Sequence, residues 1–245
     1  MKKDYIIGCG VIVIIAVLII GGSAIRKAQL NGQEAERIAD ISNSKSPQTI
    51  DDLKKTITAY EKQLDQLLKA SSKTATYWKI LATRLQDRGQ HAEALEALQN
   101  AIEHAPEDTA LFYMTGISAG IMAKSGVAFP GVESRRQAYF SLAEESYLRS
   151  IELKPDYDKP LYAIGILYAF ELDKSVEAIP YLEQYITLNA KNPEGAADAM
   201  FVLARAYYAV GNNIKAAELY DLILNTSKNQ DKHTQAALLR QRVFN

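Results

Sequence analysis

The sequence has very little of the chemistry on which metal sites and disulfide frameworks depend. It contains one cysteine and three histidines among 245 residues. A single cysteine excludes an internal disulfide and also a cysteine-rich zinc module. Basic and acidic side chains are nearly equal, 28 against 29, with a formal net charge of -1. This balance argues against the basic surface typical of nucleic-acid-binding proteins. We therefore expect no metal, no cofactor and no nucleic-acid partner.

Motifs of common enzyme classes are also scarce. The sequence has no Walker A segment, no dinucleotide-binding fingerprint and no HExxH pair. Gly116-Ile-Ser118-Ala-Gly120 does match the G-x-S-x-G pattern of serine hydrolases, but that motif requires a strand-turn-helix and this segment lies in a predicted helix. His91 and His104 are interpreted as surface histidines. We expect a non-enzymatic protein, and a serine hydrolase acting through Ser118 is a remote alternative.

The N-terminal segment is apolar enough to enter a membrane. Residues 5–25 carry no formal charge, and they are flanked by Lys2, Lys3, Arg26 and Lys27. As a helix this segment would be about 31 Å long, close to the ~30 Å thickness of the hydrocarbon layer. We therefore predict an N-terminal membrane anchor at residues 1–27, formed by a transmembrane helix.

Two other interpretations of this segment stay open. Small residues at Gly22-Ser23-Ala24 are typical of a signal-peptidase site, so the leader could be cleaved. Ile6-Ile7-Gly8-Cys9 resembles a bacterial lipobox, although the apolar run follows the cysteine instead of preceding it. Basic residues flank both ends, so the positive-inside rule barely discriminates. The very short tail before the anchor favours a single-pass bacterial protein with an extracytoplasmic body, and the cytoplasmic orientation is the alternative.

Two further segments lie between the predicted anchor and the repeats. Residues 28–46 are polar and turn-rich, which indicates a tether. Residues 47–74 are predicted to form a helix that packs on the following array. Apolar side chains recur on it at spacings of three and four residues: Ile50, Leu53, Ile57, Tyr60, Leu64 and Leu67.

A repeated pattern of large and small residues fills the rest of the sequence. The first copy follows the ~34-residue tetratricopeptide spacing and comprises Trp78, Leu81, Ala82, Leu85, Gly89, Ala94, Leu98, Ala101 and Pro106. The predicted units are 75–108, 109–157, 158–192 and 197–230, followed by a capping helix at 231–245. The second unit carries an insertion at 124–138. In the third, the closing proline is displaced to Pro193 and one residue is inserted in the turn. The fourth has Lys228 where proline would stand.

On these residues, the chain resembles the tetratricopeptide-repeat (TPR) family over about residues 75–230. The resemblance implies an all-α fold, a right-handed α-solenoid of helix-turn-helix repeats. It also implies binding of proteins, peptides or helices in a concave groove lined by the first helix of each repeat. The implied groove residues are Tyr113, Ile117, Ile121, Tyr162, Ile166, Phe170, Phe201, Arg205 and Tyr208.

Most of these groove residues are apolar, and soluble surfaces rarely leave such a cluster bare. We expect an apolar helix or peptide of a partner protein to cover it. Three other occupants stay open: the chain's own helix at 48–70, the insertion at 124–138, or a second copy in a homodimer. The insertion is interpreted either as a recognition loop carrying Phe129, Arg135 and Arg136 or as a lengthened helix pair.

These observations together predict a membrane-anchored adaptor or scaffold that mediates protein–protein interactions. The alternative function is an extracytoplasmic binding module for a hydrophobic small ligand in the same groove.

Overall fold

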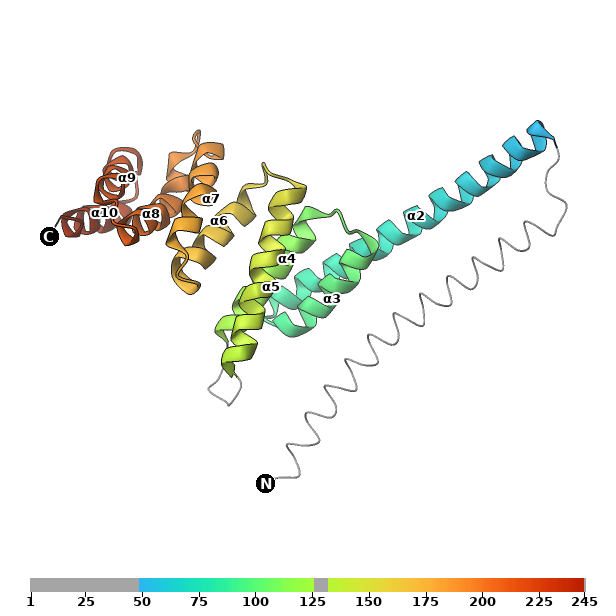
Figure 1. Cartoon of the computed structure of the whole chain (residues 1–245), viewed down its shortest axis with the longest axis horizontal. Coiled ribbons are helices and arrows are strands. Elements are labelled where there is room, and N and C mark those ends of the chain that lie inside the picture. The colour runs from blue at the N-terminus through green and yellow to red at the C-terminus, as the bar shows by residue number, and fades with distance from the viewer. Residues whose placement is uncertain (1–48, 126–131, 245) are drawn as a thin grey trace, which may run out of the picture. The chain divides into compact units, whose positions relative to one another are not determined.

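The computed structural model describes residues 49–125 and 132–244 (Figure 1). All regular elements in these two ranges are helices, so the prediction of an all-α body is confirmed. Within the same ranges, no helix combines the length and the apolar character needed to cross a bilayer. The predicted anchor at 1–27, with its apolar segment 5–25, and the tether at 28–46 lie outside the described residues.

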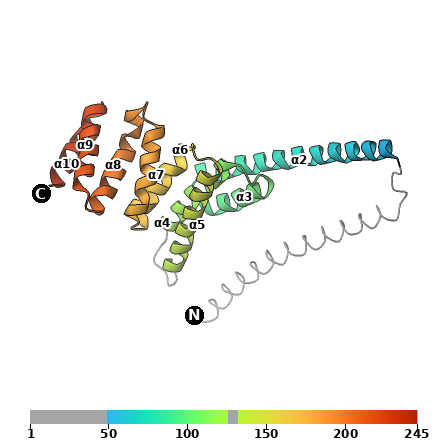
Figure 2. The same cartoon turned by 45° about the horizontal axis from the view of Figure 1, so that its top comes forward.

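Most of the described residues form a series of helical hairpins. The elements are α2 (Ile50–Asp87), α3 (His91–His104), α4 (Thr109–Lys124), α5 (Val132–Leu153), α6 (Asp158–Ile166) with the π-helical turn η1 (Leu167–Glu171), α7 (Ser175–Leu188), α8 (Pro193–Ala209), α9 (Asn213–Thr226) and α10 (Gln230–Arg242). Helix α4 packs along α5, α6 along α7 and α8 along α9, while α10 packs against α9 (Figures 1 and 2). Each helix therefore contacts mainly its neighbours in sequence, as in a solenoid.

Helix α2 joins two helices that the sequence analysis kept apart. The predicted helix at 47–74 and the first helix of the unit that starts at 75 form one continuous helix. No glycine or proline interrupts residues 50–87. Thr74 and Thr76 donate their hydroxyls to the carbonyls of Ala70 and Ser72, at 3.0 and 2.9 Å. These bonds satisfy polar side chains that would otherwise favour a turn, which explains why the polar stretch stays helical.

The chain divides into two compact units between Leu67 and Leu68, inside α2. In the N-terminal unit, the apolar residues predicted as a stripe are exposed by 47% to 73% of their surface: Ile50, Leu53, Ile57, Tyr60, Leu64 and Leu67. The packing of this helix on the array stays a prediction. The hairpins and the groove positions all belong to the second unit.

Close contact between paired helices depends on glycine at two equivalent positions. A Cβ atom added to Gly116 of α4 would lie 2.3 Å from the ring of Tyr147 on α5. One added to Gly165 of α6 would lie 2.5 Å from the side chain of Leu182 on α7. Only glycine allows this approach without displacing a buried neighbour. Gly116 and Gly165 are therefore the points where the second and third hairpins interlock.

The buried side chains of the second unit form two clusters. A small one comprises Ala82, Ala97, Leu98, Ala101 and Leu111, from α2, α3 and the start of α4. A larger one runs from Ala119 on α4 to Val243 after α10. The core is thus divided near the N-terminal end of the array and does not form the single continuous interior that a uniform stack would give.

The turns between α2 and α3, between η1 and α7 and between α8 and α9 share one backbone conformation. Gly89 and Gly211 have φ of 72° and 79°, and Asp173 occupies the same place, two residues before the next helix, with φ 54°. The amides of Gln90 and Asn212 donate to carbonyls five residues earlier, whereas Lys174 donates to Tyr168, six residues earlier. The third hairpin therefore contains the extra residue expected from its sequence, and the wider turn of η1 accommodates it.

The second hairpin is lengthened mainly through α5. This helix has 22 residues, whereas α3, α7 and α9 have 14 each. Residues 132–138 of the predicted insertion form its first turns, which agrees with the lengthened-helix interpretation for that part. Phe129, the residue proposed for a recognition loop, lies outside the described residues.

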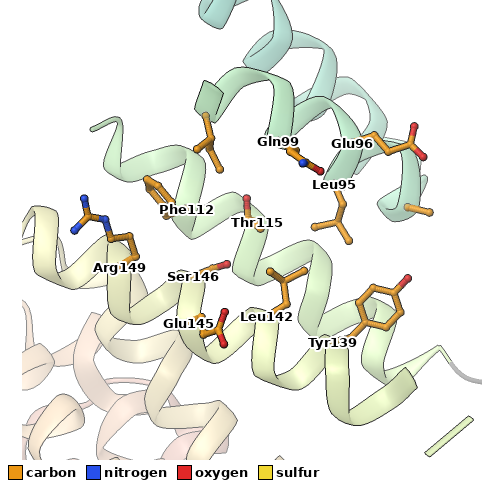
Figure 3. Close-up of a pocket in the computed structure, with 12 residues that line it drawn as sticks. Leu95, Glu96, Gln99, Phe112, Thr115, Tyr139, Leu142, Glu145, Ser146 and Arg149 are labelled. Carbon is orange, nitrogen blue, oxygen red and sulfur yellow. The ribbon is translucent and has the colours of Figure 1, made fainter. Parts of the chain in front are cut away.

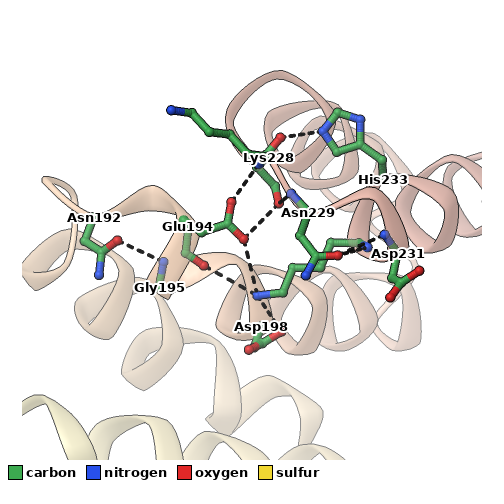
Figure 4. Close-up of polar contacts among 10 residues, drawn as sticks. Asn192, Glu194, Gly195, Asp198, Lys228, Asn229, Asp231 and His233 are labelled. Carbon is green, nitrogen blue, oxygen red and sulfur yellow. Dashed lines mark hydrogen bonds and ion pairs between the residues drawn. The ribbon is translucent and has the colours of Figure 1, made fainter.

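Proline positions at the C-terminal end differ from the expected pattern. Pro193 begins α8 and does not close the third unit. The Lys228 amide donates to a carboxylate oxygen of Glu194 at 2.8 Å, and the Ser227 hydroxyl donates to the other oxygen at 3.0 Å (Figure 4). Proline at position 228 would have no N–H to donate. The departure from the repeat pattern is therefore explained by a hydrogen bond between the start of α8 and the segment before α10.

Candidate functional site

The nine predicted groove residues lie on the first helices of three successive hairpins, on α4, on α6 with η1, and on α8. We call the surface that they form the first-helix face. The structure distributes these residues over an aromatic cluster and two cavities. The nine residues occupy equivalent positions in successive hairpins, but the face that they form consists of three parts with different chemistry.

The aromatic cluster holds Tyr113 and Tyr162. The ring of Tyr113 lies 6.2 Å from that of Tyr147 and 5.6 Å from that of Tyr157, and Tyr162 stacks on Tyr185 at 5.1 Å. Burial, and secondarily the nearby Asp158, raises the pKa of the Tyr113 phenol. These two tyrosines are half-buried and contact neighbouring rings. They therefore stabilise the face, and little of their surface is free to contact a partner.

The second part is a shallow isoleucine cavity of about 180 Å³ between the second and third hairpins. It brings together Ile117 and Ile121 from α4 and Ile166 from α6. Lys124 and Glu171 pair at 2.5 Å at its edge. The cavity offers apolar contact with one neutralised ion pair, which is typical of a packing surface.

The third part, which we call the arginine cavity, has a volume of about 440 Å³. It brings together the four remaining predicted residues: Phe170, Phe201, Arg205 and Tyr208. Helix α9 adds Tyr220, and α10 and the turn after it add Gln235, Leu239, Arg242 and Val243. The contribution of α10 was not foreseen, because the sequence indicated only a solubilising cap there.

The charged side chains that line the arginine cavity are all positive. Arg205 and Arg242 both line it, and no carboxylate side chain does. The Arg205 guanidinium lies 4.7 Å from the centre of the Phe170 ring, a cation–π geometry. Burial raises the pKa of the Tyr220 phenol, and the positive charge of Arg205 acts in the opposite direction. The cavity therefore combines aromatic walls with an excess of positive charge.

The π-helical turn is what presents Phe170 to this cavity. Leu167, Tyr168 and Ala169 of η1 are buried, whereas Phe170 is 49% exposed. Single π-helical turns are frequent at functional sites because they redirect one side chain of a helix. The inserted residue of the third hairpin thus coincides with the position of an exposed aromatic ring.

A further cavity, of about 730 Å³, was missed by the sequence analysis. It lies between α3, α4 and α5 (Figure 3), where Leu95, Phe112 and Leu142 form apolar walls and Arg149 lies 6.0 Å from the Phe112 ring. Its residues come largely from second helices. The only signal in the sequence was the insertion, which lengthens α5 beyond its neighbours.

Ser118, the centre of the G-x-S-x-G match, is fully buried within α4. Its hydroxyl oxygen accepts a 2.8 Å hydrogen bond from Gln86 and lies 3.4 Å from Nδ1 of His91. His91, interpreted from the sequence as a surface histidine, is part-buried. The residue is in mid-helix and has no strand-turn-helix around it, so the hydrolase geometry is absent at this site.

Within 49–125 and 132–244, no three His, Cys, Asp or Glu side chains gather as they would around a metal ion. Lys79 pairs with Asp108 at 2.7 Å.

No protein-family model matches the chain. Among curated proteins, it is similar to a TPR repeat-containing protein of Borreliella burgdorferi, with 24% identity over 185 residues that cover 76% of this chain and 77% of the relative.

Solved structures give the same result. The crystal structure of MamA protein is 19% identical with a TM-score of 0.55, over 70% of this chain and 82% of that one. A thermophilic TPR protein of Thermus thermophilus is 18% identical with a TM-score of 0.52, over 71% and 84%. At such identities the likeness concerns the fold, and the chain accordingly has the α-helical repeat fold of the tetratricopeptide-repeat proteins that it resembles.

Proposed function

We propose that this protein is a non-enzymatic adaptor that binds an apolar segment of a partner protein on its first-helix face. The observation that carries the proposal is the arginine cavity. It has exposed aromatic side chains, a volume that fits one or two large side chains, and two guanidinium groups with no carboxylate among its lining residues. Grooves of this kind bind helices or extended peptides through a few apolar anchors.

The chemistry of the cavity specifies the partner segment further. An apolar or aromatic anchor would pack on Phe170, Phe201 and Tyr208. A carboxylate next to that anchor would receive charge-assisted hydrogen bonds from Arg205 or Arg242. We therefore expect the bound segment to combine a large apolar residue with an acidic group.

A peptide-library selection against the full chain tests this proposal. We expect enrichment of peptides that pair an aromatic or large aliphatic residue with Asp, Glu or a free C-terminus. Phe170→Ser and Arg205→Gln should each weaken the selected peptides by about tenfold or more, as expected for loss of one anchor. Because Phe170 and Arg205 are both exposed, these variants should keep their fold.

The chain provides a matched control for this experiment. Arg149 lies over Phe112 much as Arg205 lies over Phe170, but in the cavity between α3, α4 and α5. Arg149→Gln should leave binding unchanged. The proposal fails if the library yields no ligand, or if Arg149→Gln and Arg205→Gln weaken binding equally.

A hydrophobic small ligand is the competing occupant, because about 440 Å³ also lies within the size range of small-molecule sites. Native mass spectrometry and solvent extraction of the purified chain distinguish the two. A co-purified small molecule that is lost in the Phe170→Ser variant would favour the ligand-binding alternative over the adaptor.

We also propose that residues 5–25 anchor the protein in a bacterial membrane with the helical array outside the cytoplasm. The support is the uncharged apolar run itself and its match to bilayer thickness. Resistance of the full chain to alkaline extraction, together with digestion of the body by protease added to spheroplasts, is the expected result. Release into the soluble fraction would contradict it.

A further inference from the structure

The exposed apolar stripe of α2 is spaced for a coiled coil. The intervals between its members alternate three and four residues without a break from Ile50 to Leu67. This alternation is the heptad pattern, in which apolar residues at the two positions called a and d form a straight seam. The a positions are Ile50, Ile57 and Leu64, and the d positions are Leu53, Tyr60 and Leu67.

The seam is exposed and confined to one part of the helix. All six side chains are exposed by 47% or more. The next a and d positions would be Ser71 and Thr74, both polar. At that point the helix enters the core of its own chain, since Ala75 is buried and the Ser71 hydroxyl lies 3.1 Å from Nδ1 of His104. The heptad pattern thus ends where contacts within the chain begin.

We infer that this seam is the dimerisation surface of the protein and that its occupant is the same segment of a second copy, aligned in parallel. A heptad seam is complementary to another seam of the same spacing, and a second copy supplies one in identical register. Isoleucine occupies two of the three a positions and leucine two of the three d positions, and this combination favours two-stranded parallel coiled coils. The pattern extends over about 27 Å of helix, close to the three heptads at which such pairing becomes recognisable.

Charge placement is compatible with parallel pairing. In a parallel dimer the g position of one helix faces the following e position of its partner. These pairs are Thr56 with Glu61 and Gln63 with Leu68, so neither opposes like charges. Charged residues such as Lys55 and Lys62 lie on the opposite side of the helix, at the f position.

Site-specific disulfide formation in the membrane-reconstituted full chain tests the inference. In a Cys9→Ser background, which removes the single native cysteine, Leu53→Cys and Leu67→Cys place thiols at d positions near the two ends of the seam. Parallel pairing brings each thiol within disulfide distance of its own copy. Mild oxidation should therefore cross-link both variants. Lys55→Cys and Lys62→Cys place thiols on the opposite side, and they should cross-link at least about tenfold more slowly.

Each outcome of this experiment decides the matter. An antiparallel pair, a foreign partner helix or a stripe lying on the membrane would leave Leu53→Cys and Leu67→Cys no faster than the f-position controls, and would overturn the inference. A second measurement is the mass of the full chain in nanodiscs. The Ile57→Glu/Leu64→Glu variant should have one chain per particle and the Lys55→Glu/Lys62→Glu variant two. A wild-type protein with one chain, or two chains in both variants, would also overturn it.

Discussion

At the residue scale, two glycines of α4 experience opposite environments. A Cβ atom on Gly116 would collide with the buried Tyr147 ring, whereas one on Gly120 would meet nothing within 4 Å. We predict that Gly116→Ala destabilises the protein by about 1–3 kcal/mol through overpacking. Gly120→Ala should stabilise it by roughly 0.5–1 kcal/mol, because alanine is the better helix former. Urea unfolding of both variants measures the difference, and equal effects would contradict the interlocking role of Gly116.

Gly211 and Asp173, which both have a positive φ in a turn between helices, provide a second comparison. Gly211 has φ 79° with open space around it, so Gly211→Ala should destabilise by about 1 kcal/mol through backbone strain alone. Asp173 adopts φ 54° at the equivalent place. We predict that Asp173→Gly has the opposite sign and stabilises by roughly 0.5 kcal/mol, because relief of strain exceeds the entropy loss of glycine. Thermal unfolding with matched buffers checks the signs.

At the scale of elements, the contact between α8 and the segment before α10 makes stability depend on pH. Hydrogen bonds from the Lys228 amide, and then from the Ser227 hydroxyl, lower the pKa of Glu194 below its ordinary value of 4.5. A group whose pKa is lowered by folding stabilises the folded state above its unfolded pKa, and this stabilisation is lost as the pH falls through the folded pKa.

We therefore predict that Lys228→Pro, which removes the amide donor, lowers the unfolding midpoint at neutral pH. It should also reduce the further loss of stability that occurs as the pH falls through the lowered pKa of Glu194. Lys228→Ala keeps the N–H and is the control. If Lys228→Ala and Lys228→Pro behave alike at both ends of the pH range, the hydrogen bond to Glu194 has no role in stability.

The sequence predicts those features of the helices that depend on residues close together in the chain, and not those that depend on packing between helices. The single inserted residue of the third hairpin is readable from spacing, because repeats place equivalent residues in register. The continuity of α2 was not predicted, since Thr74 and Thr76 favour turns unless their hydroxyls find carbonyls within the helix. The proximity of His91 to Ser118 depends on packing between helices, to which no short sequence pattern corresponds.

The candidate site, too, could be predicted only where its residues follow the repeat pattern. Its residues on α4, α6, η1 and α8 were expected from the resemblance to the repeat family. Arg242 and Leu239 were not, because the C-terminal helix belongs to no repeat and its placement depends on contacts with α9. The division of the face into an aromatic cluster and two cavities also escaped prediction, since it results from ring contacts such as that of Tyr162 with Tyr185.

At the scale of the whole molecule, dimerisation through α2 would give each particle two arginine cavities. A surface that displays many copies of one peptide could then be held at two points, which raises the apparent affinity without any new contact. We predict that Ile57→Glu/Leu64→Glu weakens binding to a densely coated surface by about tenfold or more. Its affinity for the same peptide free in solution should be unchanged. Surface plasmon resonance at high and low peptide density checks this, and a loss that is equal at both densities would contradict it.

The separation of the buried residues into two clusters has a consequence for opening of the structure. Ala97, Leu98 and Ala101 of α3 belong to the small cluster, and the cavity between α3, α4 and α5 lies where the clusters meet, so detachment of α3 disrupts only the smaller of the two clusters. Amide protons of α3 should consequently exchange with deuterium through local opening, well before those of α8, which require disruption of the large cluster. The array would thus fray from one end, and a protease would cut first near the turn at Gly89.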